Sequence, residues 1–279
     1  MAEHEKSNKR PMKVFDRPIL SYFILVICTL IVFSLFNAVQ TVLGLSGSAA
    51  DLFNLAYLIP ALLISYLLVV KVFFRGTLKG IFAIDGTVDG LKMFIPVAII
   101  DVAAFVLDLI LGTNNVLNDV LHIVAISCTA GVMEEAVFRA YVLPNFMRVK
   151  RDYKGMIFSV LFTAVIFGCT HLFNLSDGGN FGRVLSQCLT AFISGCFYAA
   201  VYLNAGTIIP VMIAHVVHDV INLLFANVTA NGAMLEAVTW QSLIPQIIFS
   251  GTELALAIRL LRPAGFDKIR AMWDEKWGL

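Results

Sequence analysis

The amino-acid sequence predicts an all-α protein: a polytopic membrane helical bundle of about eight transmembrane helices with a polar intramembrane cavity. Of 279 residues, 59% are hydrophobic and 14% are charged, whereas soluble domains are roughly half apolar and about a quarter charged. Apolar runs of roughly 20 residues, long enough to cross about 30 Å of hydrocarbon, recur along the chain. Ionisable residues interrupt several of these runs, which predicts the cavity. A soluble domain is excluded, and we expect no nucleic-acid partner.

The predicted spans form one transmembrane domain at 18–261, flanked by a basic segment at 1–17 and a tail at 262–279. The first span follows basic residues, as the apolar part of a signal peptide does. Its apolar stretch exceeds the roughly 7–15 residues of a signal peptide and no small-residue cleavage site follows, so we expect an uncleaved anchor. The eight spans are expected at 18–44, 51–73, 91–112, 118–147, 156–173, 184–203, 206–227 and 241–261.

Lysine and arginine are unevenly distributed between the connections. They gather at 6–17, 71–92, 148–154 and 259–276, whereas the connections after odd-numbered spans carry almost none, Arg183 being the exception. Basic residues concentrate on the cytoplasmic side of membrane proteins. We therefore predict a multi-pass protein of the cell membrane with both termini in the cytoplasm.

The tail has a helical pattern. Four apolar residues recur at near-helical spacing among charged ones, which is typical of an amphipathic helix lying in the membrane interface; a frayed polar tail is the alternative. These four residues are Phe266, Ile269, Trp273 and Trp277. The five cysteines are odd in number, scattered and without a CxxC pair, so we interpret them as apolar core thiols rather than disulfides or zinc ligands.

The ionisable residues inside the spans point to the functional site. Such a group costs about 2.5–3.5 kcal/mol at the bilayer centre, so those present are usually buried, paired and functional. They are Asp101, Asp108, Glu134, Glu135, Arg139, His171, His215, His218, Asp219 and Glu253.

The stretch GVMEEAVFRAYVLPNF at 131–146 places two glutamates side by side. Glu135 and Arg139 are four residues apart, so on a helix they share a face and can neutralise each other. Glu134 is rotated by about 100° from Glu135 and has no local counter-charge. It is therefore free to act as a general base, and the same geometry would suit a metal ligand.

Histidines supply the other candidates. His215 and Asp219 are four residues apart and share a helical face, and His218 could border that face. His171 stands alone on its helix, where a histidine is more often a satisfied core residue than a catalyst. That simpler interpretation weakens because three different spans each supply a polar group at comparable depth.

Three motifs together resemble a known family. EEAVFR (134–139) matches EExxxR, FGCTH (167–171) matches FxxxH, and HVVHD (215–219) matches HxxxN/D. In this order, on the fourth, fifth and seventh spans, they resemble the CPBP family of intramembrane proteases. That family includes the Rce-type CAAX prenyl endopeptidases and the bacterial Abi proteins of bacteriocin processing and self-immunity. The resemblance covers a protease core at about 118–227.

The resemblance implies an intramembrane endopeptidase acting on a membrane-associated peptide. It implies that Glu134 and His171 activate the attacking water, and that His215 and Asp219 stabilise the oxyanion. Glu135 and Arg139 are supporting residues in the same comparison. Asp219 departs from members that have asparagine there, because an ionised aspartate cannot donate to an oxyanion. It would have to be protonated, orient His215 or bind a metal.

Other functions remain open from the sequence. We favour catalysis without a metal cofactor; the alternative is a divalent ion such as zinc held by Glu134, His171 and His215. A catalytically silent membrane scaffold or bacteriocin-immunity factor could use the same fold. A proton- or ion-coupled transporter is a third hypothesis, in which Asp101, Asp108 and Glu253 would line the ion path.

Overall fold

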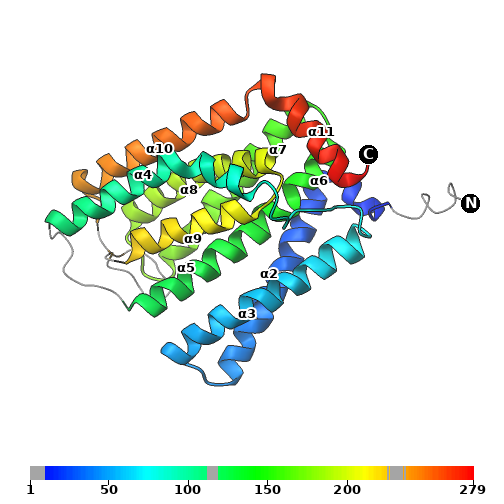
Figure 1. Ribbon diagram of the computed structural model, residues 1–279. Helices are drawn as coiled ribbons and strands as arrows, with labels where there is room; N and C mark the ends of the chain where they lie inside the picture. The colour runs from blue at the N-terminus through cyan, green and yellow to red at the C-terminus, as the bar shows by residue number, and fades with distance from the viewer. Residues whose placement is uncertain (1–9, 112–118, 225, 227–234, 236) are drawn as a thin grey trace, which may run out of the picture.

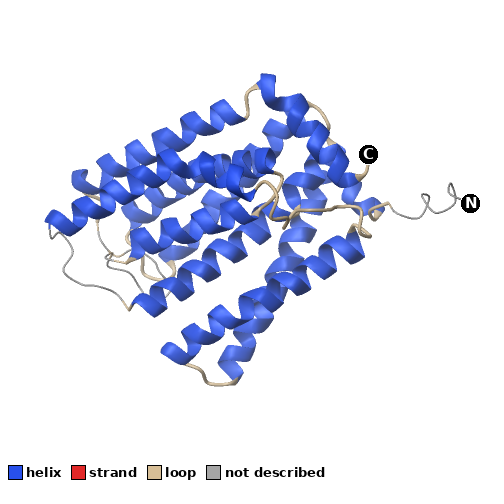
Figure 2. Ribbon diagram, viewed as in Figure 1, coloured by secondary structure: helices blue, strands red, loops and turns tan. Residues whose placement is uncertain are grey.

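The computed structural model describes residues 10–111, 119–224, 226, 235 and 237–279. Within these ranges, helices are the only regular secondary structure (Figure 2). The longer helices are α2 (Pro18–Val42), α3 (Ser48–Tyr66), α4 (Thr87–Leu111), α5 (Val120–Glu135), α6 (Val142–Val149), α7 (Tyr153–Thr170), α8 (Phe181–Ala205), α9 (Ile209–Leu223), α10 (Trp240–Leu260) and α11 (Phe266–Trp277). The short ones are η1 (Lys13–Asp16), η2 (Leu67–Phe73), η3 (Ala136–Ala140), η4 (His171–Leu175) and η5 (Pro263–Gly265).

The predicted polytopic helical bundle is confirmed. Seven helical runs in the described ranges are long and apolar enough to cross a membrane. The predicted span at 206–227 is the exception, because its helix α9 covers only Ile209–Leu223, 15 residues. At 1.5 Å per residue this helix is about 22 Å long, shorter than the roughly 30 Å hydrocarbon core. The helix starts late because Pro210 occupies its first turn, a position where proline is favoured.

The helices divide into a hairpin and a main bundle (Figure 1). α2 and α3 form the hairpin, which diverges from the other helices at the end away from the chain termini. In the main bundle, α7 packs on α8, α8 on α10, and α9 on α4, α5 and α8. The start of α2 and the end of α11 lie at the same end of the molecule (Figure 1). The membrane orientation of that end stays a prediction.

Short polar side chains set where the helices begin. Asp119 accepts hydrogen bonds from the amides of Leu121 and His122 at the start of α5. Asp152 accepts from Gly155 N at the start of α7, and Asn180 caps α8 in the same way. Such caps satisfy amides that have no partner within the helix. They fix the register in which α5, α7 and α8 present their polar residues.

The end that carries the termini is densely packed around α6. Every residue from Val142 to Met147 is buried, and α2, α7, α8 and α11 contact this helix. Asn145 Nδ2 donates hydrogen bonds to Phe15 O at 3.1 Å and Ser21 Oγ at 2.7 Å. Polar bonds therefore hold η1 and α2 onto α6.

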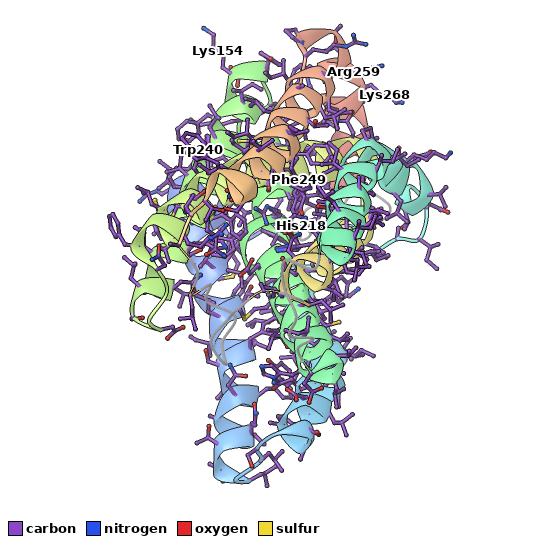
Figure 3. All side chains as sticks on the ribbon, turned by 90° about the vertical axis from the view of Figure 1, so that its left-hand side faces the viewer. Lys154, His218, Trp240, Phe249, Arg259 and Lys268 are labelled. Atoms are coloured by element: carbon purple, nitrogen blue, oxygen red, sulfur yellow. The ribbon has the colours of Figure 1, made fainter. Side chains whose placement is uncertain are left out.

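The tail forms the predicted helix, α11. Its four apolar residues at helical spacing are buried against the protein. Trp273 Nε1 donates to Leu203 O at 3.0 Å, and Trp277 Nε1 donates to Pro144 O at 2.9 Å. Figure 3 shows Lys154, Arg259 and Lys268 pointing away from the bundle near this end. The apolar face of α11 therefore packs on the bundle, while its placement in the membrane interface stays a prediction.

Candidate active site

The two glutamates lie where the fourth span changes its helical geometry. Glu134 and Glu135 end α5, and the next five residues, Ala136–Ala140, form the π-turn η3 before α6 begins. A π-turn lets one extra residue into the helix and recurs at functional sites. Arg139 lies within this turn. The first motif therefore occupies the junction between α5 and α6.

A glycine brings α5 close to α9 at this level. Gly131 lies one turn before Glu135, and a Cβ added to it would meet Val216 Cγ2 at 2.8 Å and Val216 N at 3.0 Å. Any side chain at position 131 would push the two helices apart. The close approach lets a carboxylate of α5 reach a histidine of α9.

Glu135 and Arg139 form the ion pair that their spacing predicts. Arg139 Nη1 donates to Glu135 Oε1, and the side chains are 1% and 0% exposed. The guanidinium also stacks on the ring of Phe167, 4.1 Å from its centroid, a favourable cation–π geometry. Phe167 is the first residue of the FxxxH motif, so this contact ties the first motif to the second.

Glu135 also orients His215. Its Oε1 lies 2.9 Å from His215 Nδ1; because a carboxylate can only accept, Nδ1 carries the hydrogen. The other ring nitrogen, Nε2, faces Glu134 Oε2 at 3.7 Å and Asp219 Oδ2 at 3.6 Å. Both separations exceed direct hydrogen-bond length. His215 is thus fixed on one side and open towards two carboxylates on the other.

The environments of the two adjacent glutamates differ sharply. The Glu134 side chain is 22% exposed, whereas that of Glu135 is fully buried. The Glu134 carboxyl lies within electrostatic reach of His215 and His171, and then of Asp219 and Glu135. Glu134 is therefore the more exposed of the two carboxylates and the one that interacts electrostatically with both histidines.

His171 and His215 both contact the ring of Phe167. His171 is partly buried and directly follows α7, as the first residue of η4. Its Nδ1 donates to Phe167 O at 3.1 Å, which leaves Nε2 as the acceptor. The Phe167 ring meets His171 edge-on at 5.1 Å and His215 edge-on at 6.3 Å. The second motif thus supplies both an imidazole and a ring that contacts the histidine of the third motif.

One aromatic residue of the site was not predicted. Tyr198 of α8 lies 5.4 Å from His215, ring to ring, and 5.7 Å from the Arg139 guanidinium. Like Phe167, it contacts both His215 and Arg139. In a chain with 22 phenylalanines and 7 tyrosines, nothing in the local sequence distinguishes Tyr198 from a core aromatic residue.

The remaining ionisable residues lie beside this group rather than in it. His218 Nδ1 bonds Asp101 Oδ2 of α4 at 3.0 Å. Glu253 of α10 accepts from Ser194 Oγ at 2.5 Å. The Asp108 side chain lies outside the described residues, so the predicted transport path through it has no structural description.

No metal-binding arrangement is found among the described residues. Within them, no group of three or more His, Cys, Asp or Glu side chains is placed to hold a metal ion. A catalytic zinc site needs three protein ligands, so Glu134, His171 and His215 do not fit that requirement as they stand. All five cysteines are free thiols.

A comparison with protein families agrees with the three motifs. Residues 116–221 match the family model described as type II CAAX prenyl endopeptidase Rce1-like. This segment, called the Rce1-like segment below, is similar to that family. The resemblance expected from the motifs is confirmed over that part of the chain. No match was found among curated proteins or among solved structures.

The Rce1-like segment contains the site but not all of its surroundings. It includes all three motifs, together with α5, α6, α7, α8 and most of α9. Helices α2, α3, α4, α10 and α11 lie outside it. Asp101 and Glu253 therefore come from parts of the chain that the family model does not cover.

Proposed function

We propose that this protein is an intramembrane endopeptidase that hydrolyses a peptide bond of a membrane-associated peptide or protein. The observation that supports this best is the contrast between the neighbouring glutamates. Glu135 is fully buried and paired with Arg139 and His215. Glu134 is partly exposed, and its Oε2 lies 3.7 Å from His215 Nε2. A free carboxylate beside two imidazoles is the arrangement that water activation requires.

In the proposed reaction, Glu134 removes a proton from a water molecule held between its carboxylate and His171 Nε2. The water oxygen forms a bond to the scissile carbonyl carbon, and the carbonyl electrons move to its oxygen. The tetrahedral intermediate then collapses: the carbon–nitrogen bond breaks, and Glu134 returns its proton to the leaving amine. The Nδ1 hydrogen bond that holds the His171 ring to Phe167 O supports this role.

We assign the stabilisation of the substrate oxyanion to His215. With a hydrogen on each nitrogen, His215 can donate from Nε2 to the oxyanion while Nδ1 stays bonded to Glu135. The Asp219 carboxylate, 3.6 Å from Nε2, would stabilise that imidazolium and orient it, which fits an aspartate where other members have asparagine. Losing one oxyanion donor typically costs about 10²–10³ in kcat.

The substrate class is a peptide anchored in or on the bilayer. One candidate is a prenylated CAAX peptide, to which the name of the matching family refers. The other is an unprenylated leader peptide. Each is to be tested as a substrate of the same purified protein. We expect no nucleic-acid partner.

The proposal is tested by comparing membrane-associated peptides from cells that carry the wild type or Glu134→Ala. Glu275→Ala is the matched control, because Glu275 is an exposed glutamate on α11. A peptide processed by the wild type and the control, but not by Glu134→Ala at equal protein level, is the expected result. Processing or phenotype that survives both Glu134→Ala and His171→Ala would favour the scaffold function instead.

A further inference from the structure

The second half of α9 is less buried than its first half. The residues that α9 buries are Pro210, Val211, Met212 and His215, all in its first seven positions. From Val216 to the end of the helix at Leu223, every residue of α9 is partly or fully exposed. That second half nevertheless carries Asp219, which must stay within reach of His215 and Glu134. Contacts of partly buried side chains therefore have to help fix its position.

A hydrogen-bonded pair attaches the second half of α9 to a neighbouring helix. His218 Nδ1 donates to Asp101 Oδ2 of α4 at 3.0 Å, and the two side chains are 27% and 12% exposed. The His218 ring also stacks on Phe249 of α10, with centroids 4.6 Å apart and planes at 28°. Figure 3 shows His218 and Phe249 close to each other in the bundle. His218 is thus held by two helices at once.

The direction of these contacts is as important as their number. His215 and His218 are three residues apart, so they leave α9 about 60° from each other. His215 bonds Glu135 of α5, whereas His218 bonds Asp101 of α4. Two polar bonds in different directions fix the rotation of α9 about its own axis. Asp219, which makes no such bond across to another helix among the described contacts, is placed by that rotation.

From these contacts we propose that Asp101 and His218 form a positioning pair, which sets α9 so that Asp219 and His215 face Glu134. The pair does not touch the reacting atoms. Its role for catalysis rests on the proposed function, but its effect on α9 does not. Asp101 and Phe249 lie outside the Rce1-like segment, so this attachment is supplied by the chain's flanking helices.

The test compares two substitutions of the same residue. His218→Ala removes the bond to Asp101, whereas His218→Asn keeps an amide donor close to the position of Nδ1. Hydrogen–deuterium exchange of backbone amides 216–223, measured by mass spectrometry in lipid nanodiscs, reports the attachment directly. We expect exchange in His218→Ala to be about tenfold faster, as for the loss of one hydrogen bond to a charged group, and exchange in His218→Asn to stay near the wild type.

A second pair offers a matched control. His122 Nδ1 lies 2.9 Å from Asp51 Oδ1, which joins α5 to α3 with the same side-chain chemistry. His122→Ala should leave exchange at 216–223 unchanged. Equal exchange in the wild type and His218→Ala would overturn the proposal, as would equally fast exchange in His218→Asn and His218→Ala.

Turnover adds a catalytic readout. With a farnesylated CAAX peptide and an unprenylated hydrophobic leader peptide as probes, kcat of His218→Ala should fall at least about tenfold while KM stays unchanged, because Asp219 and His215 act on the transition state. His218→Asn should recover most of kcat. A rise in KM with kcat unchanged would make His218 a substrate-binding residue and overturn the positioning role. If the wild type cleaves neither probe, the proposed function fails on these probes, and the exchange rates still decide whether the pair positions α9.

Discussion

The two sides of the π-turn η3 show how one continuous helical run can serve two purposes. Before the turn, Glu134 is partly exposed among the polar groups of η4 and α9. After it, Val142–Met147 are buried without exception under α2, α7, α8 and α11. The polar site and the packed end are therefore adjacent along the chain and share α7 and α8, but α9 borders only the site, whereas α2 and α11 cover the packed end.

This contrast separates chemistry from stability. Substitution of a partly exposed group in the site removes few packing contacts, so it should reduce turnover and leave the fold intact. Substitution around α6 removes buried surface or hydrogen bonds, so it should destabilise the fold and leave the turnover of folded molecules unchanged. The ion pair of Glu135 and Arg139 belongs to both regions, because it is buried and also orients His215.

The largest effect is expected at Arg139, where the two regions meet. Arg139→Met leaves the fully buried Glu135 carboxylate without its counter-charge, which should cost about 3–5 kcal/mol of unfolding free energy. Turnover should be lost as well, because Glu135 no longer holds His215. Unfolding in detergent micelles and peptide cleavage measure the two effects. Arg270→Met is the control, since Arg270 is exposed and makes only a 3.7 Å contact with Asp274; a loss of similar size there would contradict the interpretation.

A comparable loss of stability is expected from Trp273, without an effect on the chemistry. Trp273→Ala removes a buried ring that packs edge-on against Tyr202 at 5.2 Å, which should cost about 3–5 kcal/mol. The kcat of the molecules that remain folded should equal that of the wild type. Trp273→Phe loses the bond to Leu203 O and part of the buried ring, so it should cost less than Trp273→Ala, about 1–3 kcal/mol. A fall in kcat for either variant would show that the two regions are coupled.

A smaller effect is expected where α5 meets α9. Gly131→Ala places a Cβ against Val216, which should cost about 1–3 kcal/mol and lower kcat by moving His215 away from Glu135. Adding Val216→Ala should recover only part of the loss, because Val216 N still lies 3.0 Å from the new Cβ. Gly251→Ala in α10 is the control. A Cβ there has no atom within 4 Å, so that change should be neutral or slightly stabilising.

The smallest effect is expected from chelation. We predict that 1,10-phenanthroline or EDTA leaves kcat unchanged, since no three-ligand group is found among the described side chains. The measurement is cleavage by purified protein before and after chelation, with zinc added back. Activity lost on chelation and restored by zinc would establish the metal-dependent alternative.

Local spacing predicted the parts of the site that lie on one helix. The separation of four residues predicted the contact of Glu135 with Arg139, and the 100° rotation predicted a different environment for Glu134. Contacts between helices could not be read in this way. The stacking of Arg139 on Phe167, the proximity of Tyr198 and the bond from His218 to Asp101 each depend on how distant segments pack.

Two features of the fold were also beyond local patterns. Apolar length predicted a span at 206–227. The helix α9 begins only at Ile209, next to Pro210, and ends at Leu223. The four apolar residues of α11 were recognised from their spacing. Periodicity cannot distinguish a lipid surface from a protein surface, and in the structure these residues pack on the bundle.

The neighbouring glutamates offer the most direct test of the whole account: unfolding free energy and kcat measured together for Glu134→Gln and Glu135→Gln. The unfolding free energy of Glu134→Gln should equal that of the wild type within about 0.5 kcal/mol. Its kcat should be lower by a factor of about 10²–10⁴. Glu135→Gln should lose several kcal/mol of stability, because Arg139 is left as an unpaired buried charge. Undiminished cleavage by Glu134→Gln, or equal stability of both variants, would contradict the division of roles between these two residues.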